Sequence, residues 1–238
     1  MLMMNGELDV PFISMLEQKL EKEKMRFVRV DSDVLDNLIR KQEEFKPQFT
    51  PEQQEIAQTL FKSQIPSVEK AEFMVSFAAM SPDDQPVVIT QAEYMRRMKD
   101  MARFQPGMSF YGEMPDMYSM VLNTKHPLIQ KVVELAEQSL DAELKPVNEE
   151  IAATQNVINA LQDLKKDDKE LPEDKKQDLE DNRKHIDELR QKKENIVTAY
   201  AAGESRVHQL IDIALLSNGM LKGEGLTRFL KRSVGLLK

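Results

Sequence analysis

Apolar residues near the N-terminus follow strand-like and helix-like spacing in turn. Leu2-Met3-Met4 is an apolar run, and residues 25–30 alternate apolar and polar positions as a half-buried strand does. Helical spacing lies between these segments and again after them, so residues 1–45 predict a β-α-β fragment followed by a helix. A strand at the first residues has no earlier partner strand, and we therefore expect preceding sequence to complete this domain. The helical patterns consist of Phe12, Met15, Leu16 and Leu20, and of Val34, Leu35, Leu38 and Ile39.

Residues 46–140 predict a small sheet with helices. The charged, proline-containing segment 41–48 marks a domain boundary. Thr50-Pro51-Glu52-Gln53 then places an N-cap hydroxyl, a proline at the first helical position and a glutamine at the third, which predicts a helix of about a dozen residues. Thr90-Gln91-Ala92-Glu93 has the same form and predicts a second helix, rich in methionine. Strand-like patterns cover residues 72–80, 87–89 and 117–122, which we expect to form one sheet.

A different pattern, in which apolar residues alternate spacings of three and four, occupies residues 141–198. Such heptad spacing is typical of packed helix pairs. The segment between the two series is charged and contains Pro172, so the simplest prediction is an antiparallel helical hairpin with about two or three heptads per arm. Asn182 and Lys193 are polar residues of the second series and weaken it as a long dimeric coiled coil. The series are Leu144, Val147, Ile151, Thr154, Ile158 and Leu161, then Leu179, Ile186, Leu189, Ile196 and Tyr200.

Two amphipathic helices are predicted at the C-terminus. The first ends at Asn218-Gly219, and Gly223 and Gly225 lie in the connection to the second. Their apolar faces can pack within the chain or against a second copy, because a two-fold four-helix bundle buries both helices. Periodicity alone leaves these alternatives evenly balanced. The apolar faces comprise Val207, Leu210, Ile211, Ala214 and Leu215, then Leu226, Phe229, Leu230, Val234 and Leu237.

These patterns together predict an α+β fold with a small mixed sheet, an inserted helical hairpin and a C-terminal helix pair. We assign residues 1–45 to one domain and 46–238 to a second, with the hairpin inserted at 141–198. Charged residues make up 31% of the chain while its 8 glycines and 11 prolines are few, which favours helix-rich globular structure. The formal net charge of −8 argues against nucleic acid as a partner, because contact with phosphates requires clustered Lys and Arg.

Signals for catalysis are weak throughout the sequence. The chain has no cysteine, which excludes disulfides, thiolate metal sites and a cysteine nucleophile, and fits a reducing cytoplasm. His126, His185 and His208 contain no i, i+4 pair for zinc, and no glycine is placed to cradle a phosphate. The segment 107–112 lacks the spacing of a nucleophile elbow. We therefore predict no catalytic residue, no metal ligand, no signal peptide and no membrane span.

Methionine and aromatic residues are concentrated between residues 94 and 120. Ordinary core packing is one interpretation. The other is an exposed surface that binds apolar partners, because flexible thioether side chains can repack against many shapes. Accessibility of the helix from Tyr94 to Phe104 decides between them. The residues concerned are Tyr94, Met95, Met98, Met101, Phe104, Met108, Phe110, Tyr111, Met114, Met117 and Met120.

Several of these segments resemble the heat-shock protein 90 chaperones, in the bacterial form of that family. Leu2-Met3-Met4-Asn5-Gly6-Glu7-Leu8-Asp9 and Phe27-Val28-Arg29-Val30 are similar to the late part of the family's middle domain. The block from Val87 to Met98, with Met114-Pro115-Asp116 and the segment from Leu122 to Leu128, is similar to the family's C-terminal domain. This second block carries the more specific part of the resemblance.

The two C-terminal helices complete the resemblance. Gln209 to Leu216 and Leu226 to Arg232 resemble the helices that form the family's dimer interface. The resemblance therefore implies a homodimer built on a four-helix bundle, and it assigns the ten apolar residues of these helices to the interface. It also implies a cytoplasmic chaperone that holds unfolded or partly folded client proteins. A client-contacting helix of the family matches Tyr94, Met95, Met98 and Met101, and the candidate client surface extends to Phe104, Met108, Phe110 and Tyr111.

The family is ATP-dependent, but its ATPase lies in an N-terminal domain that has no matching positions here. The resemblance thus implies no enzyme activity and no cofactor for this region, with ATP and Mg²⁺ confined to the full-length family member. Two features depart from the family. The 141–198 hairpin is absent from most members, and Leu236-Leu237-Lys238 differs from the acidic tail of eukaryotic cytosolic members, so co-chaperones that bind that tail are not expected. The alternative function is a non-chaperone scaffold that binds partners through the hairpin.

Overall fold

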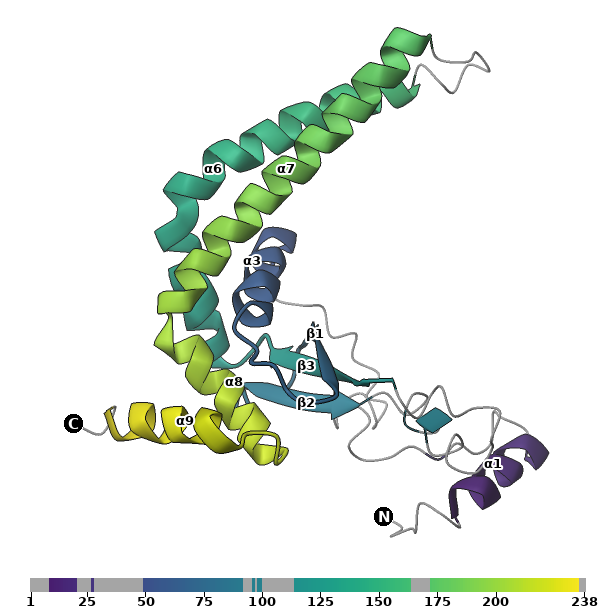
Figure 1. Cartoon of the computed structure of the whole chain (residues 1–238), viewed down its shortest axis with the longest axis vertical. Coiled ribbons are helices and arrows are strands. Elements are labelled where there is room, and N and C mark those ends of the chain that lie inside the picture. The colour runs from purple at the N-terminus through teal and green to yellow at the C-terminus, as the bar shows by residue number, and fades with distance from the viewer. Residues whose placement is uncertain are drawn as a thin grey trace. The chain divides into compact units, whose positions relative to one another are not determined.

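The computed structural model describes residues 9–20, 27, 49–91, 96, 98–99, 114–163 and 172–235. Contacts divide the chain into two compact units. Unit 1 comprises residues 1–49, 65–130 and 208–238, and unit 2 comprises residues 50–64 and 131–207. Each unit is therefore assembled from segments that are distant along the chain (Figure 1).

Unit 1 contains a three-stranded mixed sheet. The central strand β3 (Asp116–Asn123) runs parallel to β1 (Ala71–Ala78) and antiparallel to β2 (Val87–Gln91) on its other side (Figure 1). The three predicted strands form one sheet, as expected. Phe73 stacks on its parallel partner Tyr118 with ring centroids 5.5 Å apart. The buried apolar side chains of the strands include Val75, Val87, Ile89, Met120 and Leu122.

A buried asparagine fastens the end of the central strand. Asn123 Oδ1 accepts a hydrogen bond from the Met80 backbone N–H at 3.2 Å, and Nδ2 donates to the Ser81 carbonyl at 2.8 Å. The helix α6 (Pro127–Asp163) follows after a short turn. His126 caps its start, because Nδ1 accepts the Leu128 backbone N–H at 3.1 Å. This histidine is structural.

The C-terminal helices are α8 (Ser205–Ser217) and α9 (Gly223–Gly235). Gly219 has a φ of +68°, a left-handed conformation that glycine adopts without steric cost. Its N–H donates to the Leu216 carbonyl at 3.0 Å, and the Met220 N–H donates to the Leu215 carbonyl at 2.9 Å. These bonds satisfy free carbonyls at the helix end. The helix stop predicted at Asn218-Gly219 is confirmed.

The described residues of unit 2 include α3 (Pro51–Lys62) and most of two longer helices. Thr50 Oγ1 accepts the Gln53 backbone N–H at 3.2 Å, and Gln53 Oε1 accepts the Thr50 backbone N–H at 3.1 Å. This reciprocal capping box and the proline at the first turn confirm the predicted start of a helix of 12 residues. Leu60 and Phe61 of α3 are fully buried.

The other two helices of unit 2 are α6 and α7 (Glu173–Gly203), which lie side by side (Figure 1). His185 Nε2 of α7 is 3.0 Å from Glu150 Oε1 of α6. Both helices are longer than the heptad pattern predicts, since α6 begins before residue 141 and α7 continues beyond residue 198. The heptad residues Leu144, Val147, Thr154, Ile158, Ile186 and Leu189 are buried, and Ile151, Leu161, Leu179, Ile196 and Tyr200 are partly exposed.

Lys193, predicted to weaken the heptad series, is buried and paired. Its Nζ lies 2.7 Å from Glu55 Oε2, so α7 contacts α3 through an ion pair at this point. A long side chain that reaches a carboxylate on a neighbouring helix can be buried at lower cost than an unpaired charge. The polar residue therefore fastens α3 to α7.

The predictions for the N-terminal region and the second helix have mixed outcomes. The predicted N-terminal helix is confirmed as α1 (Asp9–Lys19). The strands predicted at 2–4 and 25–30, the helix at 34–39 and the boundary near residue 45 fall outside the described residues, Phe27 excepted.

The capping box predicted at residues 90–93 is wrong. Thr90 and Gln91 belong to β2, where they pair with Ser119 and Tyr118, so sheet pairing overrides the local capping preference. Arg96, Met98 and Lys99 are helical.

Candidate functional site

The helix α8 has two faces with different surroundings. One face carries five of the predicted dimer-interface residues, and the chain itself buries them to 5% exposure or less. Successive residues turn by 100° around a helix axis, so Ile213 and Leu216 lie on the opposite face. Their exposed fractions are 45% and 41%. Sequence analysis did not select these two residues, although their i, i+3 spacing marks a second apolar stripe. The buried residues are Val207, Leu210, Ile211, Ala214 and Leu215.

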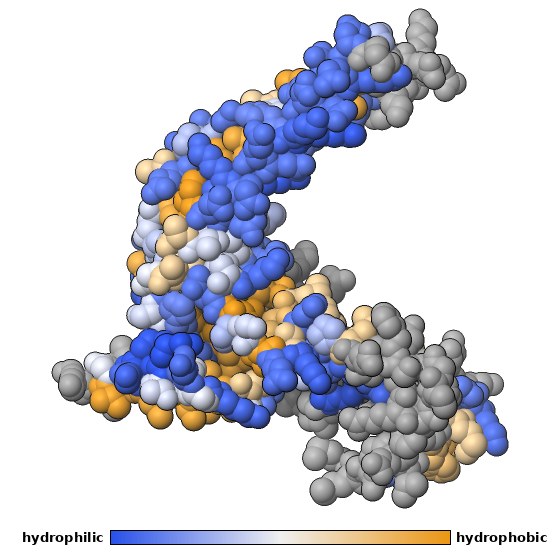
Figure 2. All heavy atoms as spheres, in the orientation of Figure 1, coloured by the Kyte–Doolittle hydropathy of each residue, from blue (hydrophilic) through white to orange (hydrophobic). Residues whose placement is uncertain are grey.

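The helix α9 also has a covered and an open face. Phe229 is buried and Leu226 is half-buried, whereas Leu230 and Val234 are 53% and 56% exposed. Figure 2 shows hydrophobic residues gathered along one edge of α9. Leu237 falls outside the described residues. The exposed large apolar residues of these two helices are therefore two of α8 and two of α9, and we call Ile213, Leu216, Leu230 and Val234 the terminal apolar patch.

The candidate client-binding helix is described at one predicted residue. Met98 is helical and half-buried, and the other seven candidates fall outside the described residues. Its helical neighbours are tied to the sheet. Lys99 Nζ lies 2.8 Å from Asp116 Oδ1, and Arg96 Nε donates to Gln91 Oε1 at 2.7 Å. Gln91 Nε2 in turn donates to the same Asp116 oxygen at 3.0 Å. A polar network thus holds this segment at the edge of the sheet.

The remaining methionines of the Met-rich interval are divided between core and surface. Met120 is fully buried, and Met114 and Met117 are partly exposed. Tyr118, between Met117 and Met120 on β3, also interacts with the network: burial raises the pKa of its hydroxyl, the Asp116 carboxylate adds to this rise, and Arg96 opposes it. Core packing is therefore correct for Met120.

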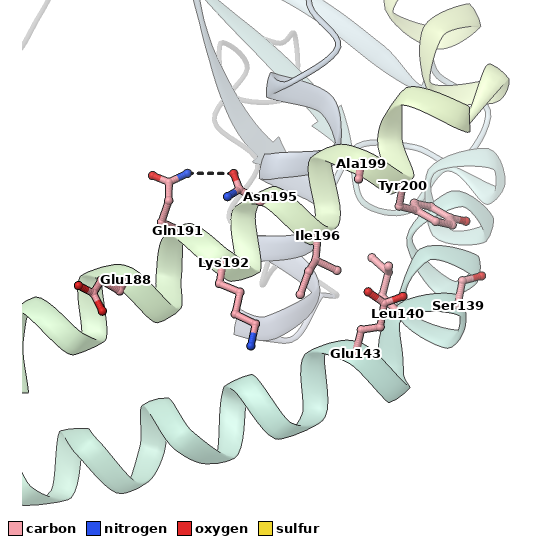
Figure 3. A pocket seen from close by; sticks show the side chains of 10 residues that line it. All are labelled: Ser139, Leu140, Glu143, Glu188, Gln191, Lys192, Asn195, Ile196, Ala199 and Tyr200. Atoms are coloured by element: carbon pink, nitrogen blue, oxygen red, sulfur yellow. Dashed lines mark hydrogen bonds between the residues drawn. The ribbon is translucent and has the colours of Figure 1, made fainter.

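A groove of about 730 Å³ runs between α6 and α7 in unit 2 (Figure 3). Leu140, Ile196 and Tyr200 line it from the two helices, and Glu143 and Lys192 add charged groups. Such a surface has apolar and charged parts but no compact set of reactive groups. Among the described residues, no three His, Asp or Glu side chains are placed to hold a metal ion, and no helix is long and apolar enough to span a membrane.

Comparisons with known proteins place the chain among bacterial chaperones. It is 49% identical to the chaperone protein HtpG of Bacteroides thetaiotaomicron and 48% identical to that of Bacteroides fragilis, over 99% of this chain and 35% of each relative. The HtpG of Porphyromonas gingivalis is 41% identical over 99% of this chain and 34% of its own length. This chain belongs to the HtpG chaperone family. No family model and no solved structure matches it.

The HtpG relatives confirm the resemblance read from the sequence, and they do not favour the alternative of a non-chaperone scaffold. The chain spans about 35% of the length of these relatives and corresponds to a C-terminal part of HtpG. Because the match covers 99% of the chain, it includes the residues of α6 and α7. The segment 141–198, which the sequence analysis expects to depart from most of the heat-shock protein 90 family, thus has aligned residues in these HtpG relatives.

Proposed function

We propose that this chain is the dimerisation and client-contact module of an ATP-dependent HtpG-type chaperone. The terminal apolar patch carries this proposal: four large apolar residues on two neighbouring helices are 41–56% exposed. A two-fold dimer brings the same patch of two copies together, and a four-helix bundle of α8 and α9 from each copy has this form. In the same proposal α6 and α7 form an antiparallel hairpin that extends the module, supported by the contact of Glu150 with His185.

The energy available from the terminal apolar patch fits a concentration-dependent dimer. Complete burial of an aliphatic side chain is worth about 1.5–3 kcal/mol, so half-exposed residues retain roughly 1 kcal/mol each. Eight such residues in two copies give roughly 8 kcal/mol, from which association costs of at least several kcal/mol are subtracted. The remainder supports pairing at moderate affinity.

Co-purification of two differently tagged copies tests the dimer. The two wild-type copies should co-purify after co-expression, and Val234→Asp in both copies should abolish this while the circular dichroism spectrum stays unchanged. Leu210→Glu is the contrasting variant: the chain itself buries Leu210, so this charge should damage the fold rather than the dimer alone. If Val234→Asp copies co-purify as well as wild type, the patch does not carry dimerisation.

Client contact is assigned to the Met-rich helix, supported by the family resemblance and by the partly exposed Met98. Met95→Ser with Met98→Ser should weaken the ability of the chain to suppress aggregation of an unfolded model protein. Met120→Leu in the core is the matched control and should leave this ability intact. Unchanged suppression by the double variant contradicts the assignment. ATP and Mg²⁺ belong, in this proposal, to the whole chaperone rather than to these residues.

A further inference from the structure

A polar seam joins α8 to α9. Gln209 Nε2 donates to Ser233 Oγ at 2.9 Å, and Arg232 Nη2 forms an ion pair with Asp212 Oδ2. Asp212 is only 8% exposed although it carries a charge. The two bonds involve residues about one turn apart on α8 and two adjacent residues on α9, and together they fix both the distance and the relative position of the helices.

The seam lies on the same side of α8 as the exposed apolar residues. Around the helix axis, Gln209 and Asp212 lie opposite Leu210, Ile211 and Ala214 and on the same side as Ile213 and Leu216. Polar bonds therefore join α9 to α8 on this side, while the apolar residues Ile213 and Leu216 stay exposed. The orientation of α9 decides where Leu230 and Val234 lie relative to Ile213 and Leu216.

The seam is poorly suited to adding stability. An ion pair removed from water loses solvation that its attraction repays only with complete hydrogen bonding, and apolar replacements are often as stable or more so. Here Gln209 Oε1 and Arg232 Nε are buried and form no hydrogen bond with any described residue. The best-attested role of buried polar pairs between helices is to fix register and association state.

We propose that Asp212 and Arg232, with Gln209 and Ser233, are positioning residues that hold α9 in the register at which the terminal apolar patch is self-complementary. This inference rests on the proposed dimer. Without the seam, α9 can slide along the apolar parts of α8, and the four apolar residues no longer match those of a second copy. The partner that the seam selects is a second copy of this chain, aligned in one way.

Two double variants of the full chain test the positioning role. Asp212→Leu with Arg232→Met replaces the pair by apolar side chains of similar size, and Asp212→Arg with Arg232→Asp exchanges its charges. The first should keep or raise the denaturant midpoint of unfolding, yet weaken the dimer at least tenfold or yield mixed oligomers. The exchanged variant restores the ion pair and should therefore form a dimer within about threefold of the wild-type affinity. A tenfold loss of affinity in the apolar variant corresponds to about 1.4 kcal/mol.

Sedimentation separates the outcomes. An apolar variant that dimerises as tightly and uniformly as wild type overturns the positioning role, and so does an exchanged pair that is as weak as the apolar one. Gln209→Leu with Ser233→Ala is a milder second disruption and should weaken the dimer in the same direction if the other variants fold poorly; an unchanged dimer also contradicts the proposal. A monomeric wild-type chain instead removes the proposed function, which distinguishes the two failures.

Discussion

The two helix pairs of this chain, α6 with α7 and α8 with α9, show the same apolar periodicity but bury it differently. In unit 2, Val147 and Ile158 of α6 and Leu189 of α7 are buried, and hydrophilic residues predominate over α6 and α7 (Figure 2). In unit 1, α8 is buried on one face, while Leu230 and Val234 of α9 remain more than half exposed. One pair is largely satisfied within the chain and the other is not.

Apolar periodicity predicts that one face of a helix is covered, but it does not predict what covers that face. The heptad series was predicted to pair within a hairpin, whereas periodicity left the apolar faces of α8 and α9 evenly balanced between packing within the chain and an interface between copies. In the structure Leu210 and Leu215 are buried by the chain itself, and Ile213 and Leu216 are the exposed large apolar residues of α8.

The largest effect is expected from a charge in the terminal apolar patch. Leu230→Glu should raise the dissociation constant of the dimer at least about 100-fold, because each copy then buries an unpaired carboxylate at a cost of several kcal/mol. Val157→Glu is the matched control, since Val157 is 47% exposed on α6. Sedimentation equilibrium of both variants measures the effect. Equal weakening by the control erases the distinction between the pairs.

A cavity in unit 2 should affect folding rather than assembly. Leu189→Ala removes a side chain that is 5% exposed and should lower the free energy of unfolding by about 2–5 kcal/mol. Leu128→Ala, at a residue 53% exposed on α6, should cost less than about 1 kcal/mol. Urea unfolding followed by circular dichroism compares them. If Leu189→Ala dissociates the dimer without lowering the unfolding midpoint, the buried residues of unit 2 act in assembly and not in folding.

A smaller effect is expected at the ion pair that fastens α3 to α7. Glu55→Ala leaves the buried Lys193 without its carboxylate and should cost about 1–2 kcal/mol, less than a fully buried pair because Glu55 is 55% exposed. Glu55→Leu with Lys193→Met should restore stability to within about 1 kcal/mol of wild type. Thermal unfolding checks both. If the double variant is no more stable than Glu55→Ala, side-chain packing rather than the ion pair accounts for the lost stability.

The smallest expected effect is on the pH dependence of stability, and it comes from Tyr118 in unit 1. Burial and Asp116 raise the pKa of Tyr118 in the folded chain, so folding favours its protonated form. This stabilisation is complete below the ordinary pKa of 10.0 and is lost as pH rises through the higher folded value. Tyr118→Phe should therefore blunt the fall in denaturant midpoint above pH 10. Identical profiles for variant and wild type would refute this role.

The solvent-exposed pair Glu180 and Lys184 on α7 is the control for this titration. The hydrogen bond between them lowers the pKa of Glu180 and raises that of Lys184, but both side chains are more than 60% exposed. Screening by water and salt leaves such pairs little effect on stability. Lys184→Met should leave the pH profile above pH 10 as it is in wild type. A change as large as that of Tyr118→Phe would remove the contrast.

Local signals predicted much of the fold. Thr50 with Gln53 marked the start of α3 and Gly219 the end of α8, because caps and left-handed glycines act over a few residues. Alternation likewise predicted the three strands. The register of the sheet and the strand membership of Thr90 and Gln91 depend on β3, which lies later in the chain, so the local capping pattern gave the wrong answer there.

The candidate site was less predictable because its contacts join distant residues. Lys193 reads as a defect in a heptad series until Glu55, 138 positions away, is placed beside it. Asp212 and Arg232 lie on different helices, and neither residue type marks a seam by itself. The family resemblance implies a dimer, whereas the exposed fractions indicate which apolar residues of α8 and α9 are open to a second copy.

Sedimentation of the unaltered chain over a range of concentrations measures directly whether the terminal apolar patch pairs two copies. Mean mass should rise reversibly from 27.4 kDa towards twice that value. The transition should lie between micromolar and millimolar concentration, because roughly 8 kcal/mol of apolar burial would alone give micromolar affinity and is reduced by the cost of association. Ile213→Ser with Leu216→Ser should move the transition to higher concentration. A wild-type chain that stays at 27.4 kDa up to about 1 mM, where binding energy falls to roughly −4 kcal/mol, would contradict it.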